Sequence, residues 1–273
     1  MENNAYPKIK NAVLLCLLFL GIQLAGGFIL GEISQFYEIG TESPAFGIGT
    51  IFLYILSFAV IILIGFKKSG KKFNEVFFIK NVSLRVWVSV VVFMLGFVII
   101  SSEIENWINY IMPMPVFLQE TFNSMIGNDY FIIPVILVVI LPAFFEEMFF
   151  RGILISGFRQ NYSQTKTILI SALLFAIIHL NPYQFVTAFL IGIIIGYVLI
   201  KTNSIWPAVY MHFFNNMLTV IVMRINGVVV IDGFNSAYGE QLLQPWWFNL
   251  LGIVFAGAGA WLFFREIDKE KSA

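Results

Sequence analysis

The chain has 273 residues, of which 59% are hydrophobic and only 12% charged, and its 16 basic residues balance its 16 acidic ones. About half of the residues in a soluble domain are apolar and about a quarter are charged, so this composition excludes a soluble globular protein. We expect the lipid bilayer to be its environment and no nucleic acid to be its partner.

Eight hydrophobic windows are long enough, at about 20 residues each, to cross about 30 Å of hydrocarbon. In chain order they cover residues 11–31, 47–66, 84–102, 131–158, 166–182, 184–201, 205–223 and 246–264. The fifth and sixth are short and share the break at Asn181 and Pro182, because proline lacks an amide donor and disfavours helix just before it. The sequence therefore predicts an all-α, polytopic membrane bundle of about eight transmembrane helices.

The basic residues predict the orientation of these helices, because lysine and arginine are retained on the cytoplasmic side of a membrane. With eight spans, nearly all of them fall on one side: Lys8, Lys10, Lys67, Lys68, Lys71, Lys72, Lys80, Arg85, Arg159, Lys166, Lys201, Arg265, Lys269 and Lys271. The opposite loops hold only Arg224 and are otherwise acidic. We therefore expect a multi-pass protein of the cell membrane with its N- and C-termini cytoplasmic.

A few ionisable or amide side chains interrupt the apolar windows. They are Glu146, Glu147 and Arg151 in the fourth window, His179 in the fifth, and His212, Asn215 and Asn216 in the seventh. Such groups are costly at membrane depth and face a protein interior or a wet cavity. Because the chain's only two histidines accompany a carboxylate pair, a functional site is favoured over purely structural hydrogen bonding.

Spacing separates the two glutamates. Glu147 and Arg151 are four positions apart and share a helix face, so Arg151 can neutralise Glu147. Glu146 lies about 100° round the helix without a partner nearby in the sequence. This pattern predicts Glu147 and Arg151 as a supporting pair, Arg151 as buried, and Glu146 as the reactive group. The structural alternative is a buried ion network in which both glutamates share Arg151.

The remaining polar residues suit one reaction class. Glu146, assisted by His179, can take a proton from a water molecule that attacks a carbonyl carbon. His212 and Asn216, four positions apart on one face, can donate hydrogen bonds to the resulting oxyanion. The residues predict peptide-bond hydrolysis, and this scheme uses no cofactor and no metal ion.

Three motifs in this order resemble the CAAX protease and bacteriocin-processing family of glutamate intramembrane endopeptidases, which includes the type II CAAX prenyl endopeptidases. The motifs are Glu146-Glu147-x-x-x-Arg151, Phe175-x-x-x-His179 and His212-x-x-x-Asn216, and the resemblance covers roughly residues 132–222. It implies that Glu146 activates water with His179 as its partner. It further implies an oxyanion site at His212 and Asn216, with support from Glu147, Arg151 and Phe175. A substrate would be a membrane-anchored protein or peptide, with or without a lipid group.

We accordingly expect three parts in the chain. Residues 1–130 would hold the N-terminal membrane helices and an acidic outer loop. Residues 131–223 would form the catalytic helical core with the three motifs. Residues 224–273 would comprise an outer loop, the last membrane helix and a cytoplasmic tail.

Other functions remain open from the residues alone. A zinc-dependent membrane protease could use Glu146 or Glu147 with His179 and His212 as ligands, although the chain lacks the HExxH pair that places two histidine ligands on one helix. Serine proteolysis is disfavoured, because no G-x-S-x-G sequence is present. A non-catalytic membrane adaptor or bacteriocin-immunity-type protein could keep the cluster for packing. A transporter or proton channel could use it as a relay, but no repeated halves are visible.

Overall fold

A computed structural model describes residues 5–120, 132–224, 231–234 and 243–272. The regular structure within these ranges is helical throughout, as predicted. Its elements are α1 (Ile9–Phe36), α2 (Pro44–Ser69), α3 (Phe73–Phe77), α4 (Leu84–Ile111), α6 (Ile132–Pro134), η1 (Val135–Ile140), η2 (Pro142–Glu146), η3 (Met148–Leu154), α7 (Ile155–Asn161), α8 (Gln164–Ile178), α9 (Pro182–Thr202), α10 (Ile205–Arg224) and α11 (Trp246–Ser272).

Seven helices in the described part of the chain are long and apolar enough to cross a membrane, counting Ile132–Asn161 as one. They correspond to every predicted window except the fifth. That window forms α8, which is apolar but has 15 residues and therefore rises only about 22 Å. The protein is thus a multi-pass membrane helical bundle, with one helix too short to span by itself.

The short helix α8 ends where the sequence predicted a break. Leu180 has a φ of 50°, in the left-handed region, so the chain leaves the helical path there. The side chain of Asn181 then accepts a hydrogen bond from the Tyr183 amide at 3.0 Å and caps α9, with Pro182 at its first position. This turn fixes where the His179 end of α8 lies relative to α9.

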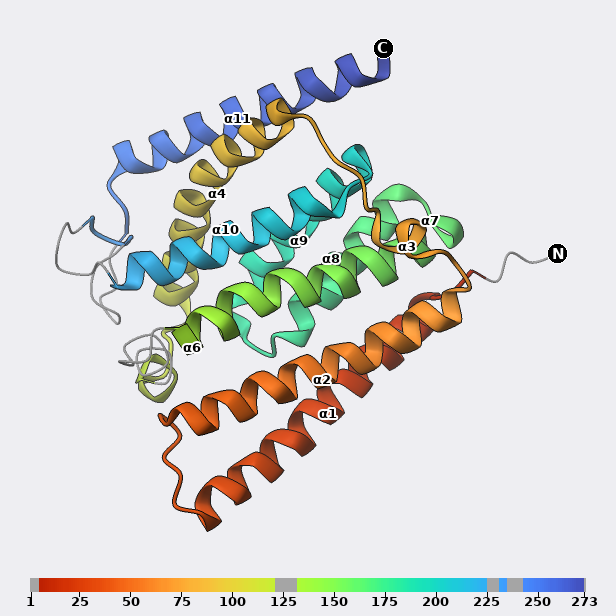
Figure 1. Ribbon diagram of the computed structural model, residues 1–273. Coiled ribbons are helices and arrows are strands. Elements are labelled where there is room, and N and C mark those ends of the chain that lie inside the picture. Colours follow the sequence, from red (N-terminus) through yellow and green to blue (C-terminus); the bar gives the residue numbers. More distant parts are fainter. Residues whose placement is uncertain (1–4, 121–131, 225–230, 235–242, 273) are drawn as a thin grey trace.

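The helices form a bundle with two flanking pairs (Figure 1). The α1–α2 pair runs along one flank and the α4–α11 pair along the other, with the helices that carry the three motifs between them. Within the α4–α11 pair the backbones touch. A Cβ atom added to Gly96 would lie 2.2 Å from the Ala256 amide nitrogen, and one added to Gly259 would lie 2.3 Å from that of Phe93. Small residues therefore permit this close approach.

Gly96→Leu is expected to destabilise the protein by about 1–3 kcal/mol or more, because the clash is with backbone atoms that no side-chain rotation relieves. The matched control is Gly257→Leu on α11, where nothing lies within 4 Å of an added Cβ. Thermal unfolding of the detergent-purified variants, followed by tryptophan fluorescence, measures both. Equal melting temperatures for the two variants would contradict the backbone contact.

Several contacts join the helix ends that carry the basic residues. The Lys71 Nζ atom donates to the Ser156 carbonyl at 2.6 Å, and Asn161 Nδ2 donates to the Ala5 carbonyl at 2.9 Å. Arg159 Nη1 donates to Asn203 Oδ1 at 3.2 Å. Partial burial in this contact lowers the pKa of Lys71. Basic side chains therefore lie together at one end of the bundle, as the charge pattern predicted.

The cytoplasmic placement of that basic end and the boundaries of the three predicted parts remain predictions. Residues 121–131 of the predicted acidic loop lie outside the described residues. The same is true of residues 225–230 and 235–242 in the predicted loop before α11.

Candidate active site

The two glutamates lie in the helix that runs from Ile132 to Asn161, and the middle of this helix is π-helical in η1, η2 and η3. In π-helix the amide bonds to the carbonyl five residues back, as the Leu141 amide does to the Ile136 carbonyl. Pro142 follows immediately and supplies no amide donor, so the ordinary hydrogen-bond ladder is interrupted at this point. Short π-helical turns are frequent at functional sites.

Glu147 and Arg151 form an ion pair inside the protein. Arg151 Nε lies 3.1 Å from Glu147 Oε2, and both side chains are fully buried. Arg151 Nη2 also donates to the Gly192 carbonyl at 3.3 Å, and the guanidinium carbon lies 4.5 Å from the centre of the Phe175 ring. The predicted burial of Arg151 is confirmed. Glu147 and Arg151, four positions apart, are in contact although much of the helix that carries them is π-helical.

His212 connects the two glutamates. Its Nδ1 atom lies 2.9 Å from Glu147 Oε1, and its Nε2 atom lies 4.0 Å from Glu146 Oε2. Because the Glu147 carboxylate is paired with Arg151, it can only accept, so the proton of this hydrogen bond belongs to Nδ1 of His212. Glu147 thereby orients the ring so that Nε2 faces Glu146.

Glu146 has one occupied and one available carboxylate oxygen. Tyr54 in α2 donates through its hydroxyl to Glu146 Oε1 at 2.7 Å. The other oxygen, Oε2, is buried and has no hydrogen-bond partner among the described residues. An unsatisfied buried carboxylate oxygen is costly and is the kind of group that a bound water or substrate would satisfy.

Tyr54 was not predicted from the sequence. It lies 92 positions before Glu146, and the only available signal was a phenol hydroxyl in the middle of an apolar window. A tyrosine in a membrane helix is too common to single out without knowing which helix it faces.

The Phe175 ring lies between the two histidines. It is 4.8 Å from the His179 ring and 5.6 Å from the His212 ring, measured between ring centres. His179 Nδ1 lies 2.7 Å from the Phe175 carbonyl oxygen, an acceptor, so Nδ1 carries the proton and Nε2 is left as an acceptor in the neutral ring. His179 thus joins the cluster through Phe175, whereas Glu146 is in contact with Tyr54 and His212.

Asn216 links α10 to the helix that carries the two glutamates. Its Nδ2 atom donates to the Val138 carbonyl in η1 at 2.8 Å, and its Oδ1 atom accepts from Asn215 Nδ2 at 3.2 Å. A primary amide has two N–H donors, so Asn216 keeps one more for a ligand. The seven predicted site residues therefore lie within one network of contacts, except that Asn216 is linked through the helix backbone and not through a side chain.

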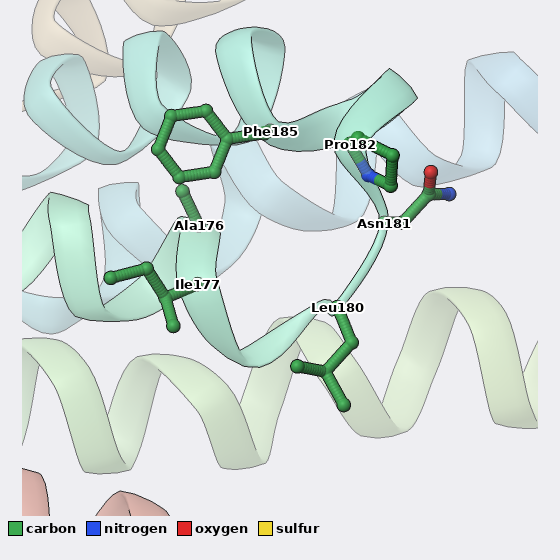
Figure 2. A pocket seen from close by; sticks show the side chains of 6 residues that line it. All are labelled: Ala176, Ile177, Leu180, Asn181, Pro182 and Phe185. Atoms are coloured by element: carbon green, nitrogen blue, oxygen red, sulfur yellow. The ribbon is translucent and has the colours of Figure 1, made fainter.

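A pocket lies beside this network, at the turn between α8 and α9 (Figure 2). It is an open pocket with a volume of about 310 Å³ and is lined by Ala176, Ile177, Leu180, Asn181, Pro182 and Phe185. The Phe185 ring lies over Ala176, and Asn181 supplies the one polar side chain. None of the seven predicted site residues lines this pocket, so it is an apolar neighbour of the cluster and not the polar cavity that the motifs suggested.

A zinc site would require three side chains, Glu146 or Glu147 with His179 and His212, to lie around one point. Within the residues that the structure describes, no group of three His, Cys, Asp or Glu side chains is arranged to hold a metal ion. In the cluster, His212 contacts both carboxylates, whereas His179 is hydrogen-bonded to the Phe175 carbonyl and to neither glutamate. The ligand set proposed for a zinc site does not fit this arrangement.

The comparison with family models agrees with the motifs. The model described as Type II CAAX prenyl endopeptidase Rce1-like matches residues 128–218. This range includes all three motifs and excludes Tyr54, and it confirms the predicted resemblance. The chain matches no curated protein and no solved structure. The matched family indicates a membrane protease, a hydrolase of the CAAX type.

Proposed function

We propose that the chain is a glutamate-type intramembrane endopeptidase, which hydrolyses a peptide bond in a membrane-associated protein or peptide through water activated by Glu146. The observation that carries this proposal is the buried Glu146 Oε2 atom, unpaired and facing an imidazole that Glu147 orients. A buried carboxylate of this kind is positioned to accept a proton from water.

In the proposed reaction, a water molecule lies against Glu146 Oε2. The carboxylate takes its proton as the oxygen attacks the scissile carbonyl carbon, and the resulting carboxylic acid later returns the proton to the leaving amine. The Nε2 atom of His179 is an acceptor in the neutral ring and can receive the second hydrogen bond of the water.

Oxyanion stabilisation falls to His212 and Asn216 in this proposal. An imidazole that carries a proton on both ring nitrogens has a donor at Nε2 as well as at Nδ1. His212 would then donate from Nε2, while Asn216 would donate with its remaining N–H. Glu147, Arg151 and Phe175 support these residues by fixing the His212 ring.

We further propose that the protein resides in the cell membrane, with the basic end of the bundle and both termini on the cytoplasmic side. The charge distribution supports this orientation. The substrate would be anchored in the same bilayer, because a soluble peptide would have to desolvate fully to reach Glu146, whose side chain is 10% exposed.

The test uses the purified full-length chain in proteoliposomes, mixed with a panel of membrane-anchored peptides with and without a lipid group. Products are identified by mass spectrometry, with and without a zinc chelator. Cleavage that persists in chelator supports the glutamate mechanism. Cleavage that chelator abolishes and zinc restores would overturn it in favour of the zinc protease. If no peptide in the panel is cleaved, and cells that carry Glu146→Gln behave as cells that carry the wild-type protein do, the non-catalytic adaptor is favoured.

A further inference from the structure

We infer that Tyr54 is a positioning residue for Glu146, so that α2, which lies outside the range matched by the family model, supplies a working part of the site. This inference rests on the proposed function, because Tyr54 would act through the carboxylate that activates water. It extends the site from the central helices to the α1–α2 pair on one flank of the bundle.

The first support is the fixed place of the Tyr54 ring. Its centre lies 5.0 Å from that of Phe58, one turn further along α2. Phe58 is fully buried and in turn packs against Phe19 of α1, 4.4 Å away between ring centres, and against Phe149 of η3, 6.4 Å away. The hydroxyl is therefore held in place by a cluster of aromatic rings that joins three helices.

The second support is the asymmetry that the phenol imposes on the carboxylate. The Tyr54 hydroxyl occupies Glu146 Oε1 at 2.7 Å and leaves Oε2 as the unpaired oxygen that faces His212. A phenol O–H is a donor that a carboxylate accepts strongly. Without it, Glu146 could turn about its terminal torsion, which is broad for glutamate, and present either oxygen.

Other groups near Glu146 do not replace this hydrogen bond. Glu147 is engaged with Arg151 and His212, and His212 Nε2 lies on the opposite oxygen at 4.0 Å. Tyr54 is thus the donor that selects which oxygen of Glu146 meets the water. Small misplacements of a catalytic group cost large factors in rate, since reaction requires a narrow range of geometries.

The test is Tyr54→Phe, which removes the hydroxyl and keeps the ring in the aromatic cluster. We expect kcat for peptide cleavage, expressed per folded protein, to fall about 10-fold or more, with KM within about twofold of wild type. The melting temperature should fall somewhat as well, because Glu146 Oε1 loses its donor. The matched control is Tyr197→Phe, which removes a hydroxyl from α9, where the ring packs against Phe264 instead. This control is expected to leave kcat unchanged.

A second readout does not depend on cleavage. Infrared difference spectra should show a carboxyl band that disappears in Glu146→Gln and shifts in Tyr54→Phe but not in Tyr197→Phe. An unshifted band, or an unchanged kcat in a protein that does cleave, would overturn the role of Tyr54 and leave the proposed function intact. A loss of cleavage no larger than the loss of folded protein, with kcat per folded protein unchanged, would overturn it in favour of a structural hydrogen bond. Wild-type protein without cleavage would overturn the proposed function itself.

Discussion

Glu146→Gln is expected to lower kcat for peptide cleavage by about 10²–10⁴-fold, the range that a positioned general base contributes. The amide keeps the size of the side chain and can still accept a hydrogen bond from Tyr54, but it cannot take a proton from water. The short contact of Arg151 is with Glu147 and not with Glu146, so the melting temperature of this variant should fall less than that of a variant that removes the Glu147 charge.

Glu147→Gln is the comparison that separates the two glutamates. It removes the anion that lies 3.1 Å from Arg151 Nε and leaves a buried guanidinium without its partner. We expect a smaller loss of kcat and a larger loss of melting temperature than in Glu146→Gln. Rates on one cleaved peptide and thermal unfolding of the same preparations measure both. The reverse ranking in both assays would show that the roles of the two glutamates are exchanged.

Arg151→Met is expected to destabilise the protein by about 3–5 kcal/mol, because it leaves a fully buried carboxylate uncompensated. Methionine fills much of the same volume, so the loss would come from charge and hydrogen bonding more than from packing. The variant also gives up the donor to the Gly192 carbonyl and the contact with the Phe175 ring. We expect little folded protein to survive detergent extraction.

The control for this variant is Arg159→Met, eight positions along the same helix. Arg159 is exposed and donates to Asn203 at the basic end, where water can replace the contact. Its loss should change the melting temperature little. The double variant Glu147→Met with Arg151→Met removes both charges and should recover part of the stability lost in Arg151→Met. If Arg151→Met unfolds at the same temperature as Arg159→Met, the buried ion pair does not stabilise the fold.

Much of this fold follows from composition and spacing, because lipid exposure allows long apolar windows to be recognised without knowledge of their neighbours. The windows at α1, α2, α4, α9, α10 and α11 are full-length helices, as is the one from Ile132 to Asn161. The length of α8 was overestimated because its window was carried through His179 to Pro182, whereas the helix ends at Ile178. The left-handed backbone of Leu180 is set by the path of the turn, and a leucine in an apolar sequence gives no indication of it.

Contacts between site residues could be predicted where the two residues are close in sequence, and could not where they are far apart. Glu147 with Arg151 and Phe175 with His179 follow from i,i+4 spacing, which places such pairs on one face. The bond between His212 and Glu147 joins residues 65 positions apart, and the one between Tyr54 and Glu146 joins residues 92 apart. Helix-face arguments cannot decide between such distant partners, so the contacts of Glu146 with Tyr54 and His212 were not predicted, and the role of His179 beside Glu146 stays a prediction.

The order of these partners along the chain also bears on how the protein is made. The helix that carries the glutamates also carries Arg151, the partner of Glu147, and Tyr54 precedes this helix in the chain. His212, in contrast, follows Glu147 by 65 residues. At about 5–20 residues per second, this gap corresponds to about 3 to 13 s of translation. The order of synthesis therefore makes Arg151 available to Glu147 and Tyr54 available to Glu146 before His212, which is synthesised last and completes the cluster.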